Sequence, residues 1–181
     1  DILKENKRLY RISKIISDLS EELKVPAFLV GGCVRDLFLD PKKNSVDIDI
    51  MVEGDGIAFA NLLGVKLNVS TVVPFTKFNT ARIPYKECEI EVASARLETY
   101  DPKSRSPKDI TLTDINEDLQ RRDFTVNAMA ISLQKENLGT LIDPFKGLQD
   151  LNDKILRTPL KNAETTFSDD PLRMIRAAYF S

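Results

Sequence analysis

Two aspartates, Asp47 and Asp49, stand one residue apart in the run Val46-Asp47-Ile48-Asp49-Ile50-Met51-Val52. This alternation predicts a β-strand, in which residues i and i+2 lie on the same face. Both carboxylates therefore project from one face, while the intervening aliphatic side chains face the core. Paired carboxylates on a rigid strand suit Mg²⁺, which keeps most of its waters and takes further ligands from substrate phosphates. The competing interpretation is a pair of solvated aspartates on an exposed strand face.

A glycine turn, Gly31-Gly32, precedes this strand and follows the short apolar run Ala27 to Val30. Backbone N–H groups in such a turn can bind phosphate oxygens, particularly where a helix begins directly after it. The turn and the two aspartates together therefore favour a site for a phosphorylated substrate and a divalent metal ion.

The composition limits the chemistry of this site. The chain of 181 residues has 42% apolar content, enough for a core, but it contains no histidine and only two cysteines. A zinc cluster, a disulfide framework and histidine-assisted serine or cysteine catalysis are therefore excluded. The expected metal is Mg²⁺, or else Mn²⁺.

The charge balance and the hydropathy pattern bound the environment of the protein. The formal net charge is −2 and the sequence pI is near 5.4, so any contact with nucleic acid must be local. The sequence has neither a run of roughly 20 apolar residues that could span a membrane nor a secretory signal. We therefore expect a cytosolic protein that makes no membrane contact.

Hydrophobic periodicity and turn residues predict an alternation of helices and strands, and hence an α+β fold. The spacing predicts helices over 3–23, 34–39, 54–63 (ended by Gly64), 114–130, 147–153 and from the Asp169-Asp170-Pro171 segment to the last residue, strands over 27–30, 46–52, 69–73, 78–83, 87–93, 130–133 and 140–143, and a loop over 98–110.

The ordered motifs of the chain resemble the catalytic head of class II nucleotidyltransferases, the family of the tRNA CCA-adding enzymes and bacterial poly(A) polymerases. Individually each motif is modest evidence, but their order and spacing together are specific. The matching segments, over roughly residues 27 to 178, are Leu29-Val30-Gly31-Gly32-Cys33-Val34-Arg35-Asp36, Asp47-Ile48-Asp49, Arg121-Arg122-Asp123-Phe124-Thr125-Val126-Asn127-Ala128, Asp143-Pro144-Phe145-Lys146-Gly147-Leu148-Gln149-Asp150-Leu151 and Phe167-Ser168-Asp169-Asp170-Pro171-Leu172-Arg173-Met174-Ile175-Arg176-Ala177.

The resemblance implies a polymerase-beta-like nucleotidyltransferase head. Its small mixed or antiparallel sheet would carry the active site on one face and helices on the other. The head would then continue into the start of a helical neck. We expect an N-terminal helix packed on the head over 1–26, the head domain over 27–160 and the start of the neck over 161–181. Because the chain begins at Asp1 and its last helix has no stop signal, we expect both ends to continue in a longer protein, with base-selecting residues beyond Ser181.

The implied activity is template-independent addition of CMP, AMP or both to the 3′ end of tRNA, with ATP and CTP as substrates and Mg²⁺ as cofactor. CCA, CC and A addition are not separated by these motifs. Poly(A) polymerase is the alternative within the family, and a non-catalytic nucleotide-binding or RNA-binding module is the alternative outside it. Two carboxylates kept in mutual repulsion argue against the non-catalytic module.

The resemblance also assigns roles to single residues. Asp47 and Asp49 would hold the metal ions, and Gly32 and Arg35 would contact the nucleotide through close backbone approach and a charged fork. A plain left-handed turn and a surface ion pair are the alternatives for Gly32 and Arg35. Glu91 is a candidate third carboxylate, although the favoured interpretation is that it is one of three solvated glutamates on its strand.

Further nucleotide contacts are implied near the second half of the chain. We expect Arg122, Asp123 and Asn127 to share one side of a helix, where relatives contact the ribose and triphosphate. Asp123 and Asn127 could instead cap that helix or support the contacting residues. Arg176 resembles a nucleotide-binding position, whereas Arg173 would tie the last helix to Asp143 or Asp150.

Overall fold

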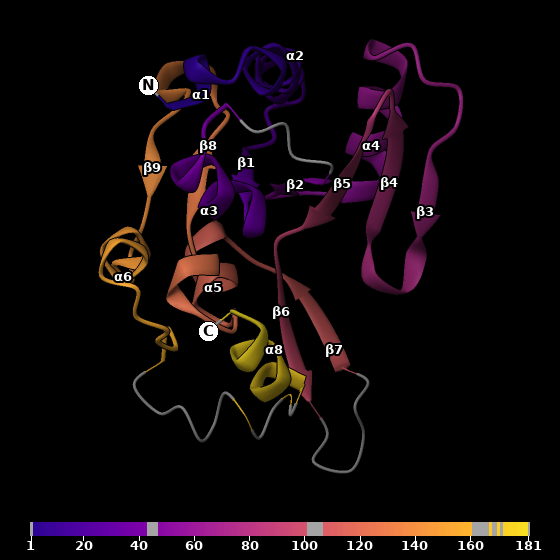
Figure 1. Cartoon of the computed structure of the whole chain (residues 1–181). Helices are drawn as coiled ribbons and strands as arrows, with labels where there is room; N and C mark the ends of the chain where they lie inside the picture. The colour runs from indigo at the N-terminus through magenta and orange to yellow at the C-terminus, as the bar shows by residue number, and fades with distance from the viewer. Residues whose placement is uncertain are drawn as a thin grey trace.

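A seven-stranded mixed sheet forms the centre of the protein in the computed structural model, in the order β3-β4-β5-β2-β1-β8-β9. The structure describes residues 2–42, 47–100, 107–160, 167, 170 and 172–180. The α+β fold with helices flanking a mixed sheet is therefore confirmed (Figure 1). The strands of this sheet are β1 (Ala27–Val30), β2 (Asp47–Val52), β3 (Val73–Phe75), β4 (Thr80–Tyr85), β5 (Cys88–Ser94), β8 (Ala130–Ser132) and β9 (Leu141–Ile142).

Strand β2 has a different relation to each of its neighbours. It pairs antiparallel with β1, where Phe28 lies opposite Met51, and parallel with β5. A parallel pair needs a crossover connection, and α4 (Gly56–Lys66) is the helix in that connection. The parallel pairing places residues of β5 beside the aspartates of β2, although the two strands are far apart in the sequence.

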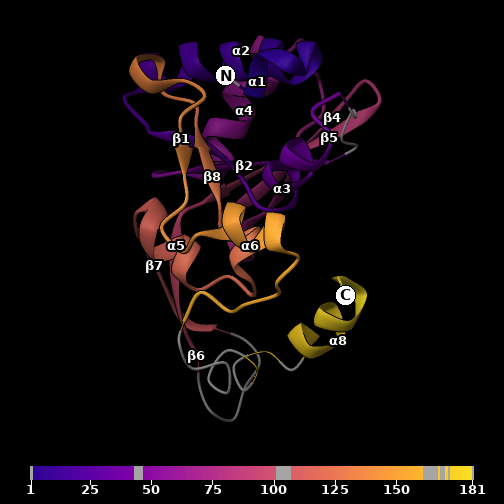
Figure 2. The same cartoon turned by 60° about the vertical axis from the view of Figure 1, so that its left-hand side comes forward.

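One face of the sheet is covered by α1 (Ile2–Glu5), α2 (Lys7–Leu23) and α4, which lie together at the top of Figure 2. The expected single helix over 3–23 is therefore two helices. They separate at Asn6, whose side chain accepts a hydrogen bond from the Leu9 N–H and caps α2. The hydrophobic periodicity that predicted this helix is confirmed, since Ile12, Ile16 and Leu19 form a buried apolar face on α2.

Helix α4 corrects another expectation, since it continues through Gly64 to Lys66. A Cβ at Gly64 would lie 2.8 Å from Cγ2 of Val72, so this glycine permits close packing rather than ending the helix. The strand expected over 69–73 begins only at Val73 as β3, at one edge of the sheet.

The opposite face carries a second apolar cluster in which Ile115 and Leu119 of α5 (Ile115–Gln120) pack against Phe28 and Met51. The helix expected over 114–130 is wrong beyond Gln120. The chain turns there and forms a short 3-10 helix, η2 (Thr125–Asn127). Helix α3 (Gly32–Leu39) packs in the first cluster, that of α1, α2 and α4, through Cys33, Val34 and Leu37, and Leu148 of α6 (Gly147–Asp153) packs against the same cluster. Helix α8 (Leu172–Phe180) lies at the other end of the molecule from α1 and α2 in Figure 2.

The loop expected over 98–110 contains a hairpin instead. Strands β6 (Arg96–Tyr100) and β7 (Pro107–Leu112) pair antiparallel and form a separate sheet; residues 101–106 lie outside the described part, as do Val46, Asp169, Pro171 and Ser181. None of the described helices is long and apolar enough to cross a membrane.

Candidate active site

The two aspartates of β2 occupy the expected face of the strand. Ile48 and Ile50 point into the core and are almost fully buried, whereas Asp47 is exposed and Asp49 is half-buried. In the parallel register of β2 with β5, Asp49 lies opposite Glu91. Residues directly opposite in a sheet share a face, so Glu91 belongs to the same acidic group as the two aspartates.

The electrostatic environment of this group favours a bound cation. Burial, followed by repulsion from Glu91 and Asp47, raises the pKa of Asp49 to about 6, although Arg122 and Arg82 act in the opposite direction. Among the described residues, neither aspartate forms an ion pair or accepts a side-chain hydrogen bond, whereas Glu91 accepts one from Nε of Arg82 at 2.8 Å. A divalent ion would relieve this repulsion.

The carboxylates form an open platform. The described residues contain no group of three or more acidic or cysteine side chains arranged around one metal ion. Hard oxygen ligands on one side of an ion, with room for water and phosphate on the other, suit Mg²⁺ or Mn²⁺. The donor set therefore fits these ions.

The glycine turn lies directly beside the platform. Gly31 has φ +73° and precedes α3, and an added Cβ there would lie 3.0 Å from Nη1 of Arg122 and 3.5 Å from Oδ2 of Asp49. The left-handed residue of the turn is thus Gly31, whereas Gly32 is the first residue of α3. Only glycine adopts this backbone conformation without strain and leaves room for both neighbours.

Arg122 belongs to a charged group at the end of α5. Asp118 is buried, with its side chain 2% exposed, and accepts hydrogen bonds from both Arg121 and Arg122. These three residues line one pocket together with Asp49 and Glu91. The arginine motif and the acidic platform therefore open into the same space.

Asp123, Asn127 and Arg35 form a second polar group. The Asn127 amide donates to Oδ1 of Asp123 at 3.1 Å, and its carbonyl oxygen accepts from Nη1 of Arg35 at 2.8 Å. Arg35 also pairs with Asp36, as a surface ion pair would. Asp123 and Asn127 meet through the turn after α5 rather than on the expected helix side, and both are buried.

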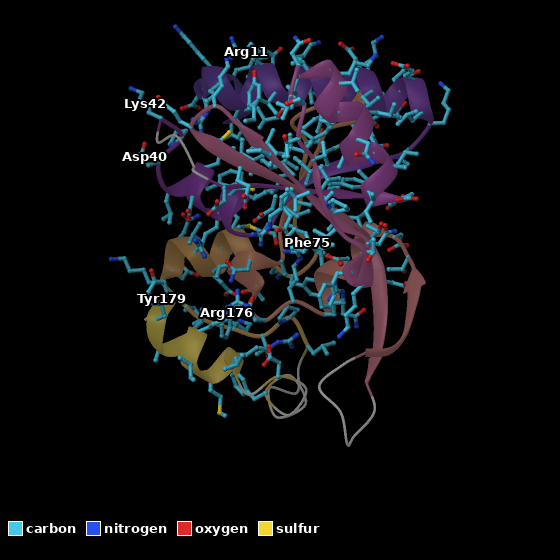
Figure 3. The ribbon with its side chains drawn as sticks, turned by 90° about the vertical axis from the view of Figure 1, so that its right-hand side faces the viewer. Arg11, Asp40, Lys42, Phe75, Arg176 and Tyr179 are labelled. Carbon is cyan, nitrogen blue, oxygen red and sulfur yellow. The ribbon has the colours of Figure 1, made fainter. Side chains whose placement is uncertain are left out.

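Helix α8 approaches this group through two arginines. Nη2 of Arg176 lies 2.9 Å from Oδ2 of Asp123, a buried atom that accepts no hydrogen bond of ordinary geometry. Nη2 of Arg173 donates to the Arg121 carbonyl oxygen at 2.9 Å, so the expected tie from Arg173 to Asp143 or Asp150 is wrong. Figure 3 labels Arg176 on α8, together with the 85% exposed Tyr179.

The segment around α6 supports the site from behind. Asp143 accepts hydrogen bonds from the N–H groups of Gly147 and Leu148 and so holds the turn that precedes α6. Asp150 accepts from Oγ1 of Thr125 at 2.7 Å and pairs with Arg157. This segment therefore fixes η2, which carries Asn127.

Comparison with known proteins decides the family. The family model described as the poly A polymerase head domain matches residues 27–157. The chain belongs to this family. The match confirms the resemblance to class II nucleotidyltransferases drawn from the motifs.

The relatives of this poly A polymerase head domain include tRNA-processing enzymes. An A-adding tRNA nucleotidyltransferase of Aquifex aeolicus is 44% identical over 155 residues, which cover 86% of this chain and 18% of that protein. A CC-adding tRNA nucleotidyltransferase of Shouchella clausii is 35% identical over 154 residues, 85% of this chain and 34% of that protein. The chain thus spans well under half the length of these relatives.

Solved structures give the same result. A CCA-adding enzyme in an apo form superposes with a TM-score of 0.85 at 38% identity, covering 99% of this chain and 41% of that one. A tRNA nucleotidyltransferase complexed with a primer tRNA and an incoming ATP analogue gives a TM-score of 0.77 at 40% identity, covering 91% of this chain and 44% of that one.

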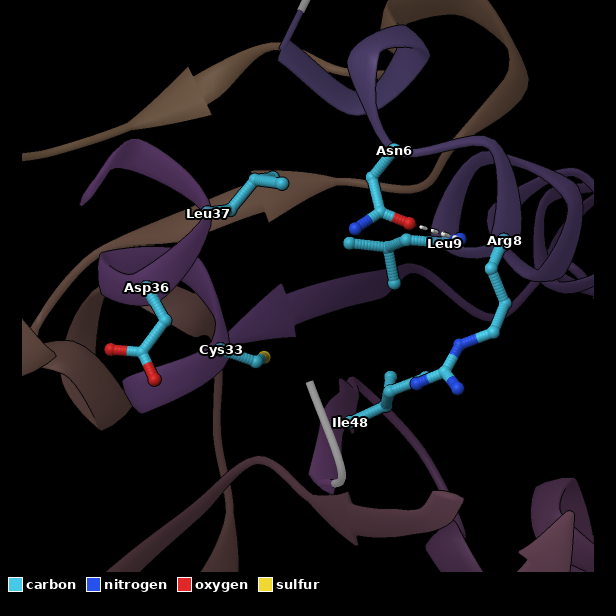
Figure 4. A pocket seen from close by; sticks show the side chains of 7 residues that line it. All are labelled: Asn6, Arg8, Leu9, Cys33, Asp36, Leu37 and Ile48. Atoms are coloured by element: carbon cyan, nitrogen blue, oxygen red, sulfur yellow. Dashed lines mark hydrogen bonds between the residues drawn. The ribbon is translucent and has the colours of Figure 1, made fainter. Parts of the chain in front are cut away.

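A second, mainly apolar hollow of the head domain lies between α2, α3 and β2 (Figure 4). Cys33 lines it, and burial raises the pKa of this thiol to about 12, so the thiol is unreactive. Two of its other polar side chains already have structural partners, since Asn6 caps α2 and Asp36 pairs with Arg35. This hollow belongs to the packing of α2 against α3.

Sequence reasoning missed two residues of the poly A polymerase head site. Gly31 could have been found, because glycine populates positive φ readily and is therefore favoured in a tight turn before a helix. Asp118 carries a weaker signal, namely an acidic residue three and four positions before two arginines. That pattern predicts ion pairs but not their burial beside the carboxylate platform.

Proposed function

We propose that the chain is the catalytic head of a Mg²⁺-dependent RNA nucleotidyltransferase that adds CMP, AMP or both to the 3′ end of tRNA without a template. The observation that carries this proposal is the convergence of three features. Asp47 and Asp49 project from β2 where the Gly31 turn and the Arg122 guanidinium meet. The relatives named above, which include tRNA nucleotidyltransferases and a structure with a primer tRNA and an ATP analogue, support it.

In the proposed reaction, the 3′-hydroxyl oxygen of the RNA forms a bond with the α-phosphorus of the nucleotide. The bond from this phosphorus to the pyrophosphate oxygen breaks, pyrophosphate leaves with the electron pair, and the hydroxyl proton passes to solvent water. Mg²⁺ or Mn²⁺ held by Asp47 and Asp49 would lower the pKa of the attacking hydroxyl and neutralise charge on the phosphates. No protein nucleophile is required, which suits a chain without histidine.

The other residues would position the nucleotide. Arg122 directs its guanidinium toward the platform and would bind the triphosphate. Helix α3 begins directly after Gly31, so its first N–H groups could bind phosphate oxygens as well. Arg35, held by Asn127, would add a second positive charge. Glu91 would support the metal site from β5, beside Asp49.

Addition of labelled nucleotides to tRNA tests this function. We expect the protein with Mg²⁺ to transfer labelled AMP or CMP to tRNA lacking part or all of its 3′-terminal CCA, and to lose this activity in EDTA. Extension of an unrelated RNA by many adenylates would instead identify a poly(A) polymerase. Binding of nucleotide without incorporation into either RNA would favour the non-catalytic module and reject the proposal.

The ribose contact gives a second prediction. Because Asn127 fixes the Asp123 carboxylate and Arg35, Asn127→Ala should narrow the preference for ATP over dATP by about tenfold. Competition between the two nucleotides in single-nucleotide addition measures this preference. Asn137→Ala is the control, since Asn137 ends the short 3-10 helix η3 (Lys135–Asn137) before β9 and accepts a hydrogen bond from Oγ of Ser132. If Asn127→Ala left the preference for ATP over dATP unchanged, the proposal that this polar group, including Asp123 and Arg176, recognises the ribose would be wrong.

We also propose that the head domain spans residues 27–160 and that the protein is cytosolic. Helix α2 packs against the sheet of the head, which favours treating the N-terminal helices as part of one folding unit with it.

A further inference from the structure

A buried carboxylate outside the acidic platform controls the direction of two arginines. Oδ1 of Asp118 accepts from Nε and Nη2 of Arg121, at 3.1 and 2.5 Å, and Oδ2 accepts from Nε and Nη2 of Arg122, at 3.1 and 3.0 Å. Each arginine thus presents the same edge to one oxygen. Such charge-assisted hydrogen bonds fix the plane of a guanidinium as well as its position.

The remaining edge of Arg122 faces the proposed nucleotide site. Its Nη1 lies near the Cα of Gly31, on the side of Asp49, and forms no hydrogen bond among the described residues. The Arg122 charge lowers the pKa of Asp49, yet the two groups form no ion pair within 4 Å. Arg122 is therefore held close to the platform but away from its carboxylates, with donors directed at the open space.

Without a fixed position, Arg122 could form ion pairs with other carboxylates in this pocket. Asp49 and Glu91 line the same pocket as Arg122, and a guanidinium forms bidentate ion pairs with carboxylates readily. Such a pair would neutralise a metal ligand and withdraw the arginine from the triphosphate at the same time. An alternative buried carboxylate prevents both changes.

We propose that Asp118 is a positioning residue for nucleotide binding, which holds Arg122 toward the triphosphate and keeps it off the metal-binding carboxylates. This inference rests on the proposed function, because it requires a triphosphate in this pocket. An aspartate is needed because its two oxygens only accept hydrogen bonds. An asparagine would turn an NH₂ group toward one of the two guanidinium groups, and that contact would place donor against donor.

A double-mutant cycle tests whether Asp118 acts through Arg122. The measured quantity is the affinity of the protein for ATP in the presence of Mg²⁺. We expect Asp118→Ala and Arg122→Ala each to weaken it by about thirtyfold, and the double variant to be no weaker than either single variant within about threefold. Asp118→Glu, which keeps the carboxylate, should recover most of the loss.

A control on the same helix separates positioning from stability. Asp114 caps α5 by accepting a hydrogen bond from the Glu117 N–H, and it forms no ion pair with either arginine. Asp114→Ala should destabilise α5 and leave the affinity within about twofold of wild type. In ¹⁵N NMR, the Nε–H signals of Arg121 and Arg122 should be protected in this control and exchange-broadened in Asp118→Ala.

The outcomes divide clearly. Additive losses from Asp118→Ala and Arg122→Ala would overturn the inference, as would equal losses from Asp114→Ala and Asp118→Ala. Failure of the wild-type protein to bind ATP with Mg²⁺ would overturn it too. Coupled losses of affinity in a protein that incorporates no nucleotide into RNA would support the inference while rejecting the proposed function.

Discussion

We expect Asp49→Ala and Asp47→Ala each to reduce nucleotide transfer by at least about a thousandfold, which corresponds to an increase of about 4 kcal/mol in activation free energy. Both carboxylates project from β2 beside Gly31 and Arg122, so either substitution removes one of the two proposed metal ligands. Initial rates of labelled AMP or CMP incorporation in excess Mg²⁺ measure the effect.

The same variants should fold normally, and stability measurements can show it. Asp49 is half-buried and repelled by Glu91 and Asp47, so removing either aspartate takes away unfavourable energy in a metal-free protein. In EDTA both variants should unfold at or above the wild-type temperature. Mg²⁺ at ten times its dissociation constant should stabilise only the wild type, by about 1.4 kcal/mol.

A matched surface variant controls for loss of charge alone. Glu21 is exposed on α2, and its one ion pair within the described part of the chain is with Lys24, so Glu21→Gln should keep the wild-type rate and the wild-type response to Mg²⁺. More than a few per cent of wild-type turnover in both Asp47→Ala and Asp49→Ala would reject the metal platform.

Sequence patterns correctly predicted elements whose conformation depends on neighbouring residues alone. The strand over 27–30 and the helix over 147–153 have the predicted bounds, because a short buried run and a glycine turn leave few other conformations. The helix over 114–130 was wrong for an equally physical reason. The Asp123 side chain bonds the next backbone N–H, that of Phe124, and such local bonds compete with helix continuation.

Sequence patterns could predict only those site residues that share one strand. Alternation placed Asp47 and Asp49 on one face of β2, but the position of Glu91 depends on a parallel register between strands separated by α4. Nothing in the spacing of β5 distinguishes Glu91 from Glu87 or Glu89. The role of Asp118 likewise depends on burial that arises only when α5 packs on the sheet.

Gly147→Ala should produce the largest loss of stability among conservative substitutions in the supporting segment. A Cβ at this position would lie 2.1 Å from the Thr125 carbonyl oxygen and 2.8 Å from its carbonyl carbon. Backbone atoms cannot move aside by a rotamer change, and Thr125 is further fixed by its bonds to Asp150 and to the Arg157 carbonyl oxygen. We expect a loss of about 3 kcal/mol in the free energy of unfolding.

The displacement should also reach the active site, because Thr125 begins η2 and η2 ends at Asn127, the hydrogen-bond acceptor for Arg35. Gly54→Ala is the matched control. A Cβ there would meet only the methyl groups of Val25, at 3.0 and 3.4 Å, and this side chain can shift, so the loss should stay within about 1 kcal/mol. Urea unfolding of both variants, with nucleotide affinity measured below the transition, compares the two positions. If Gly147→Ala were no less stable than Gly54→Ala, α6 would not be seated on η2 as described, and its support of Asn127 and Arg35 would have to be abandoned.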